Sequence, residues 1–183
     1  MSLRIEDIDR LMTRHGASLY GGEAVSQLSH ALQAAHLAQQ ANEPTAMVVA
    51  AALHDLGHLI CAQNSNNAAL AGDTDAVHEY MVLPFLRATF GPAVLEPIRM
   101  HVQAKRYLCL VESGYWASLS PASQHSMSLQ GGVLTAPQGE AFIQQAYAQD
   151  AVRLRRYDDL AKDPYAPTPP WQHVLDLMRQ VVL

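Results

Sequence analysis

The sequence predicts an all-α protein, and three observations support this fold class. Apolar residues recur every three or four positions through most of the 183 residues, as they do along α-helices that bury one face. Alternating apolar and polar stretches that would indicate β-strands do not stand out, and no internal repeat is found. The helical segments are joined by short connections with Gly, Pro or Asn. Because no linker marks a boundary, we expect one domain over residues 1–183.

The first three helices follow from apolar stripes and turn residues. A stripe of Ile, Leu and Met predicts a helix at residues 5–15, which a glycine-rich loop follows. A second helix is expected at residues 24–41, ended by Asn42 in a left-handed conformation and by Pro44, which suits the first turn of the next helix. The third helix, at residues 45–60, is apolar almost all round, which indicates a central, buried element.

The second half of the chain continues this pattern. After a polar loop at residues 62–73, Asp73 and Thr74 form a candidate N-cap for a helix that runs through Phe90. Further helices are predicted at residues 93–108, from Ser120-Pro121 to a stop at Gly131-Gly132, at residues 138–161 and, after a proline-rich linker, at residues 171–182.

Composition and charge exclude several classes of partner. Apolar residues make up 49% of the chain and charged residues 16%, and the net charge of −5 with a pI of about 5.9 favours neither nucleic acid nor a membrane surface. The acidic N-terminal segment is not expected to be a secretory signal. Cys61 and Cys109 fit two reduced thiols, and hence a cytoplasmic protein. The sequence leaves the oligomeric state open, a homodimer included.

The stretch AALHDLGH, at residues 51–58, carries the first functional signal. His54, Asp55 and His58 lie in an otherwise apolar segment that is predicted to be buried. Burying three ionisable groups is costly unless they are paired or bind a metal ion. Since His54 and His58 are four residues apart, a continuous helix would place them on one face, and Asp55 could bridge two metal ions.

Other histidines and carboxylates are expected to join this group from neighbouring helices. His30 lies mid-helix on the preceding element, His78 and Asp158 lie on later helices, and His101 lies on the apolar stripe of its helix. Imidazoles and carboxylates that converge from several helices form the usual donor set of a metal site in a bundle. The remaining histidines have no partner at ligand spacing and are expected to be structural, namely His15, His36, His125 and His173.

The order His30, His54-Asp55, Asp158 resembles the signature of the HD-domain superfamily, which consists of all-helical, metal-dependent enzymes. His78 and His101 match the two extra histidines of its dinuclear members. The resemblance implies that His30, His54, Asp55 and Asp158 hold one metal ion. It also implies that Asp55, His78 and His101 hold a second.

A longer resemblance distinguishes among the reactions of this superfamily. Taken alone, Tyr20-Gly21-Gly22-Glu23 could be a surface turn whose Glu favours the following helix dipole. With its surroundings, however, it resembles the mixed-valent diiron oxygenases that cleave carbon–phosphorus bonds, over roughly residues 15–160. The similar segments are LYGGEAVSQLSHALQ (19–33), HVQAKRYLC (101–109), LSPAS (119–123), SLQGG (128–132) and AVRLRRYDD (151–159).

This resemblance implies a specific chemistry. Two iron ions, Fe2+/Fe3+, and dioxygen as co-substrate would convert a 1-hydroxyalkylphosphonate into a carboxylic acid and inorganic phosphate. The implied small-molecule substrate is 2-amino-1-hydroxyethylphosphonate, which gives glycine, or an N-methylated analogue. Ser29 stands where this family carries a longer polar or acidic residue, which leaves the choice of amine open.

The same resemblance, with helix spacing, suggests roles for the other polar residues. Asp55, His58 and Tyr20 would lie at the reacting atoms, with Tyr20 on an iron position until substrate displaces it. Glu23 would bind a substrate ammonium. The phosphonate would be bound by Lys105, which is one helical turn from His101, with His58, Arg155 and either Ser123 or Ser126 as further donors. Arg155 could instead orient a metal ligand.

Two other functions remain open at this stage. A metal-dependent phosphohydrolase of the same fold would act on a nucleotide or phosphate monoester with Mn2+, Co2+ or Mg2+ and without oxygen. A degenerate domain that only binds a ligand would be expected to have lost ligand residues, whereas all six are present here.

Overall fold

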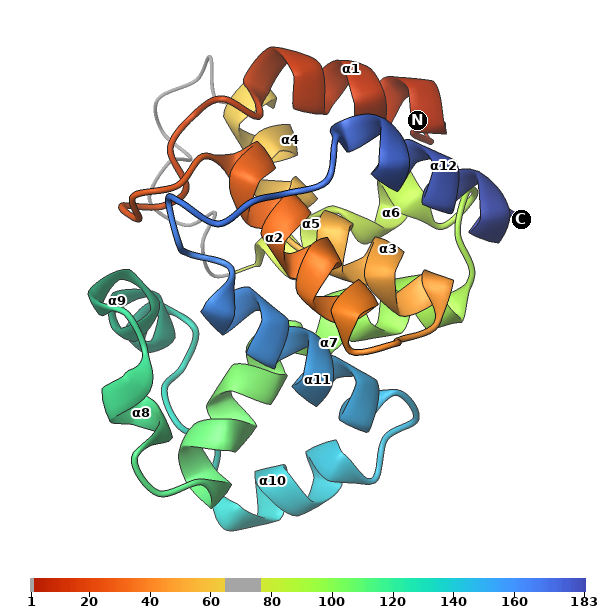
Figure 1. Cartoon of the computed structure of the whole chain (residues 1–183). Helices are drawn as coiled ribbons and strands as arrows, with labels where there is room; N and C mark the ends of the chain where they lie inside the picture. Colours follow the sequence, from red (N-terminus) through yellow and green to blue (C-terminus); the bar gives the residue numbers. More distant parts are fainter. Residues whose placement is uncertain (1, 65–76) are drawn as a thin grey trace.

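The structure, a computed structural model, describes residues 2–64 and 77–183 as helices joined by loops (Figure 1). It confirms the all-α prediction. Within these residues, extended backbone pairs only at two isolated bridges, Leu19 with Ser26 and Phe90 with Val182. The helices are α1 Ile5–His15, α2 Gln27–Gln40, α3 Thr45–Leu53, α4 Leu56–Asn64, α5 His78–Met81, α6 Leu83–Leu86, α7 Pro92–Val111, α8 Tyr115–Ser118, α9 Pro121–Leu129, α10 Ala136–Ile143, α11 Ala148–Leu160 and α12 Trp171–Val181.

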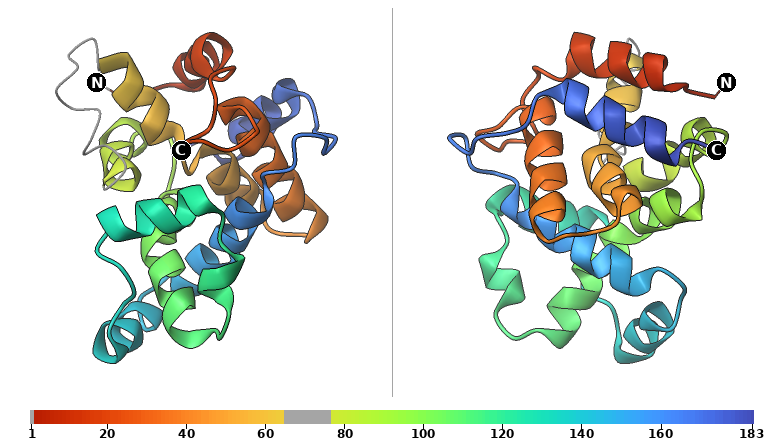
Figure 2. Two further views of the ribbon diagram at one scale, coloured as in Figure 1. Left: turned by 90° about the vertical axis from the view of Figure 1, so that its left-hand side faces the viewer. Right: turned by 45° about the vertical axis from the view of Figure 1, so that its right-hand side comes forward.

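Helix α3 forms the centre of the main core. All residues from Met47 to Leu53 are buried, and α3 packs against α2, α7, α11 and α12. An apolar surface all round the helix therefore has apolar neighbours on every side, as the sequence predicts. Helices α1 and α12 lie side by side across the end of this core (Figures 1 and 2).

Helices α7 and α11 cross between this core and a smaller region made of α8, α9 and α10 (Figures 1 and 2). They pack along each other, and a second apolar cluster that includes Met100, Phe142 and Ala151 joins them to α10. Their crossing brings His101 of α7 and Asp158 of α11 next to the ends of α2 and α3. The fold thus gathers polar residues that are far apart in the sequence.

The structure confirms the predicted helix at residues 5–15 and shifts the start of the next. Helix α2 begins at Gln27 rather than at residue 24, because the Ser26 hydroxyl accepts a hydrogen bond from the Ser29 amide and so caps the helix. Asn42 ends the turn after α2 with φ 58°, the left-handed conformation expected of it.

The prediction of one continuous helix at residues 45–60 is wrong. The segment forms two helices, α3 and α4, separated by a turn at His54 and Asp55. Beyond the turn, Gly57 packs directly on the backbone of α5, where any Cβ would collide with the carbonyl oxygen of His78. The HD pair therefore sits at a change of chain direction, which periodicity does not encode.

Two other predicted elements differ. The N-cap at Asp73 and Thr74 lies outside the described residues, and the chain up to Phe90 forms two short helices, α5 and α6, with Pro84 opening the second. The predicted helix at residues 138–161 is α10 and α11, interrupted near Tyr147, whose φ is 65°. Short helix α8 was not predicted.

Among the helices of the described ranges, none combines the length and the apolar character needed to cross a membrane.

Candidate metal centre and substrate cavity

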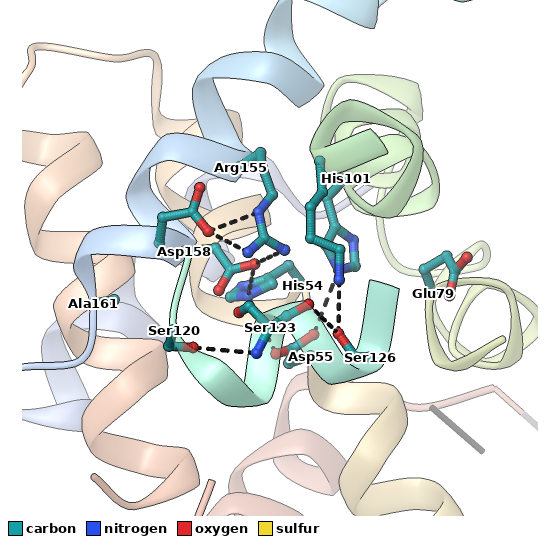
Figure 3. Close-up of polar contacts among 12 residues, drawn as sticks. His54, Asp55, Glu79, His101, Ser120, Ser123, Ser126, Arg155, Asp158 and Ala161 are labelled. Atoms are coloured by element: carbon teal, nitrogen blue, oxygen red, sulfur yellow. Dashed lines mark hydrogen bonds and ion pairs between the residues drawn. The ribbon is translucent and has the colours of Figure 1, made fainter. Parts of the chain in front are cut away.

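Four buried side chains meet where α2, the α3–α4 turn and α11 come together, namely His30, His54, Asp55 and Asp158. Figure 3 labels the last three of them. The Nε2 atoms of His30 and His54 lie 3.2 Å apart. His30 Nε2 is 3.4 Å from Asp158 Oδ1, and His54 Nε2 is 3.4 Å from Asp55 Oδ2. One ligand atom from each of the four residues lies within 4.8 Å of the others, a spacing that suits a single metal ion.

A second group of donors faces the other oxygen of Asp55. Asp55 Oδ1 lies 3.1 Å from His78 Nε2 and 3.6 Å from His101 Nε2, and these two nitrogens are 3.2 Å apart. His58 Nε2 lies 3.9 Å from the same oxygen. Asp55 therefore presents one oxygen to each group, the arrangement expected of a carboxylate that bridges two metal ions.

Backbone carbonyls fix which nitrogen of each imidazole faces the cluster. The Nδ1 atoms of His30, His54 and His101 lie 2.7–2.8 Å from the carbonyl oxygens of Ala161, Ala51 and Ile98. Because a carbonyl oxygen only accepts hydrogen bonds, each Nδ1 carries a proton, and in the neutral ring Nε2 has a free electron pair. In the pair His30 and His54, electron pairs that face each other at 3.2 Å repel unless a cation lies between them, so this donor set fits a metal.

The charges in the cluster support the same conclusion. Burial raises the pKa of Asp55 and Asp158, but neighbouring His54 and Arg155 outweigh this effect and hold both pKa values well below the usual range. Burial lowers the pKa of His54, and the two carboxylates together raise it to about 10. The cluster thus favours positive charge at its centre, from a proton or from a metal ion.

Arg155 holds the Asp158 side chain in place through an ion pair (Figure 3). Its Nη1 lies 2.7 Å from Asp158 Oδ2, and its other nitrogens bind Asp159, which also accepts a hydrogen bond from Tyr115. The guanidinium is buried, although it also borders the inner cavity. The sequence leaves two roles open for Arg155, binding of the phosphonate and orientation of a metal ligand. These contacts favour the second role, with Asp158 as the residue that is oriented.

Two neighbouring cavities, which share four lining residues, lie beside the cluster. The inner one, about 40 Å³, lies directly against Asp55, His78 and His101, and the outer one has a volume of about 250 Å³. Both are bordered by Tyr20, His58, Ser123 and Ser126.

The predicted phosphonate donors line the inner cavity. The ammonium of Lys105 is buried and donates a 2.8 Å hydrogen bond to the Ser126 hydroxyl, which places a positive charge beside the metal donors. The His58 ring stacks on His78 at a centroid distance of 4.0 Å and borders both cavities. These two side chains and Ser126 thus lie where an anion next to the cluster could contact all of them.

The Tyr20–Glu23 loop closes the outer side of the cluster. Tyr20 stacks on His30 with a centroid distance of 3.8 Å, and its hydroxyl lies 3.5 Å from Asp158 Oδ1. Glu23 lines the outer cavity, where its carboxylate accepts a hydrogen bond from Ser120 and lies 3.1 Å from Lys162 Nζ. The loop is therefore part of the site.

Two residues of the outer cavity were missed by the sequence analysis. Lys162 lies just after the end of α11, four residues beyond Asp158, and no motif draws attention to it. His125, which was expected to be structural, borders the outer cavity from α9, and its structural role stays a prediction. The only available signal was its place between the two candidate serines, Ser123 and Ser126.

Comparison with known proteins identifies relatives of the chain. No family model matches it. The hydroxymethylphosphonate dioxygenase of Gimesia maris is 46% identical over 160 residues, which cover 87% of this chain and 78% of the relative. The [1-hydroxy-2-(trimethylamino)ethyl]phosphonate dioxygenase (glycine-betaine-forming) of Leisingera caerulea is 32% identical over 178 residues, which cover 97% of this chain and 90% of that protein.

The helical fold, the buried His/Asp cluster and these relatives together define an enzyme of the metal-dependent oxygenase class. Within that class, the chain belongs to the family of the phosphonate dioxygenases, as the sequence resemblance predicts.

Proposed function

We propose that this protein uses dioxygen to cleave the C–P bond of a 1-hydroxyalkylphosphonate. With hydroxymethylphosphonate, the balanced reaction consumes one O2 and yields formate, hydrogen phosphate and one proton. Carbon and phosphorus each gain one oxygen atom, and O2 accepts the four electrons released. The observation that carries the proposal is the pair of donor groups that share Asp55, found in a chain whose named relatives are phosphonate dioxygenases.

Two iron ions fit the donor groups, which mix imidazole nitrogen with carboxylate oxygen. When bound, they would activate dioxygen and pass to it the electrons that the substrate releases. We assign His30, His54, Asp55 and Asp158 to the first iron, and Asp55, His78 and His101 to the second.

Residues of the inner cavity are suited to bind the phosphonate. The buried ammonium of Lys105 offers a positive charge to the dianion, and the Ser126 hydroxyl, which accepts from Lys105 and donates to the Ser123 carbonyl, holds that ammonium in place. His58 borders the same cavity and can bind another phosphonate oxygen. This arrangement directs the C1 hydroxyl towards Asp55 and its neighbours.

Tyr20 is positioned to shield the cluster before substrate binds. It stacks on His30 beside Asp158 and borders both cavities, so a phosphonate that moves from the outer to the inner cavity passes beside it. We infer that substrate displaces the Tyr20 hydroxyl, which limits contact of dioxygen with an empty site.

The test is phosphate release from hydroxymethylphosphonate and from 2-amino-1-hydroxyethylphosphonate by iron-loaded enzyme, with and without oxygen. We expect release only with oxygen, with one O2 consumed for each phosphate. The matched carboxylic acid, formate or glycine, should form in equal amount. Release without oxygen in the presence of Mn2+ would overturn the proposal and favour the phosphohydrolase alternative.

A further inference from the structure

Glu23, the residue expected to bind a substrate ammonium, already has an ammonium partner within the protein. Lys162 Nζ lies 3.1 Å from Glu23 Oε1 at the wall of the outer cavity. The side chains of Glu23 and Lys162 are only 14% and 12% exposed, so solvent screens this pair less than it screens a surface pair.

Neighbouring hydroxyls hold the Lys162 ammonium in place. It donates hydrogen bonds to Ser123 Oγ at 2.8 Å and to Ser120 Oγ at 3.2 Å, and Ser120 in turn donates to Glu23. The Tyr20 ring lies on another side, with its centroid 6.0 Å from Nζ. Ser123 Oγ, Ser120 Oγ and the Glu23 carboxylate thus accept the three protons of the Lys162 ammonium, so its hydrogen-bonding capacity is fully used.

These contacts link the ion pair to the substrate path. Ser123 and Tyr20 border both cavities, and Lys162 and Glu23 border the outer one. A substituent on C1 of a phosphonate bound at Lys105 would extend from the inner cavity into this space. If that substituent carried an ammonium, it would have to share the Glu23 carboxylate with Lys162, and the two cations would repel each other.

We propose that Lys162 is a specificity-determining residue that selects against a cationic substituent on the substrate. The resident ammonium neutralises Glu23, so the cavity favours a 1-hydroxyalkylphosphonate whose C1 substituent is small and uncharged, with hydroxymethylphosphonate as the simplest case. This inference rests on the proposed function and deepens it, because the phosphonate and its C1 hydroxyl are bound elsewhere in the site.

The experiment compares kcat/KM for hydroxymethylphosphonate with kcat/KM for 2-amino-1-hydroxyethylphosphonate and its trimethylammonium analogue. In Lys162→Met, Glu23 loses its internal partner. We expect the ratio of the two specificity constants to move by about tenfold or more towards the cationic substrates. Lys162→Arg, which keeps the charge, should retain the preference of the unmodified enzyme.

Two further variants separate this effect from general damage. Arg156→Met removes one positive charge from an exposed pair with Glu112, and it should leave the ratio unchanged. In the double variant Glu23→Gln with Lys162→Met, the gain for cationic substrates should disappear, because the carboxylate that would bind them is gone. Equal iron content in all variants would show that the metal centre is retained.

The outcomes distinguish the inference from the function beneath it. If the unmodified enzyme releases phosphate with oxygen but Lys162→Met lowers kcat/KM equally for all substrates, Lys162 has a structural role and the inference is overturned. A preference of the unmodified enzyme for the cationic substrates would overturn it as well. No oxygen-dependent phosphate from any of the three phosphonates would instead overturn the proposed function itself.

Discussion

The cluster of His and Asp side chains and the outer cavity are adjacent, yet they are built in different ways. The cluster residues are at most 8% exposed, and three of the imidazoles are anchored to backbone carbonyls. The outer cavity is bordered by the Tyr20–Glu23 loop, the start of α9 and the chain after α11, and its charges are held by contacts between side chains. One region is fixed by helix packing, and the other depends on individual residues.

This difference suggests that the cluster and the outer cavity have separate functions. Anchors on the main chain hold the metal donors in a geometry that side-chain changes elsewhere barely affect. Contacts between side chains at the cavity can be altered one residue at a time. We therefore expect changes in the cluster to abolish the reaction, and changes in the outer cavity to alter the choice of substrate.

The largest effect is expected from Asp55→Ala, which removes the carboxylate that both donor groups share. Both metal ions should be lost, and oxygen-dependent phosphate release should fall by about 10³-fold or more. Metal analysis of the purified protein and a phosphate assay provide the measurements. Asp150→Ala, near the start of α11 and away from the cluster, is the matched control and should keep both metals. Two metals bound by Asp55→Ala would contradict the assigned site.

Lys105→Met should affect substrate binding and spare the metals. Its ammonium contacts Ser126 in the inner cavity, so we expect KM for the phosphonate to rise by about tenfold or more while iron content is unchanged. Steady-state kinetics and metal analysis would test this. A normal KM would show that the phosphonate binds elsewhere.

Two neighbouring arginines allow a direct comparison of buried and exposed pairs. Arg155→Met leaves the buried Asp158 without its guanidinium partner, and we expect a loss of about 3 kcal/mol in the free energy of unfolding. Arg156→Met breaks an exposed pair with Glu112 and should cost less than about 1 kcal/mol. Urea unfolding of both variants measures the difference. Equal losses would show that Arg155 does not support the cluster as we describe.

Smaller effects than that of Arg155→Met are expected at two glycines, one in each region. A Cβ at Gly57 would meet the backbone of His78, so Gly57→Ala should cost about 2 kcal/mol and weaken binding of the second metal. A Cβ at Gly21 would point into open space, so Gly21→Ala should cost only about 1 kcal/mol, the backbone strain of its positive φ of 52°, and keep both metals. Thermal unfolding and metal content would compare them, and loss of metal from Gly21→Ala would contradict the separation of the two regions.

The sequence predicted the cluster better than the cavity, and the reason is physical. Histidine and aspartate are costly to bury without a partner, so their presence in apolar helices signals a shared task even before the fold is known. The structure brings together all six of the predicted ligands. The turn at His54 and Asp55 was not predictable in the same way, because it depends on the close approach of Gly57 to a distant helix.

The outer cavity gave weaker signals. A lysine near a helix end, such as Lys162, is usually solvated, and only the folded chain shows that it meets Glu23 from a loop far away in sequence. The same holds for His125, which faces the cavity because of the way α9 packs. The Tyr20–Glu23 loop was found through resemblance, since its residue types alone fit a surface turn equally well.

The hydrogen bond between His30 and the main-chain carbonyl of Ala161 has an evolutionary consequence. Every residue type supplies that carbonyl, so the adjacent position, 162, can exchange its side chain during divergence while the anchor of a metal ligand persists. An enzyme with this fold can therefore acquire new phosphonate substrates by single substitutions at the outer cavity while it keeps its metal site and its reaction with oxygen. Such tolerance of substitutions at position 162 would allow one ancestral enzyme to give rise to descendants with different phosphonate specificities.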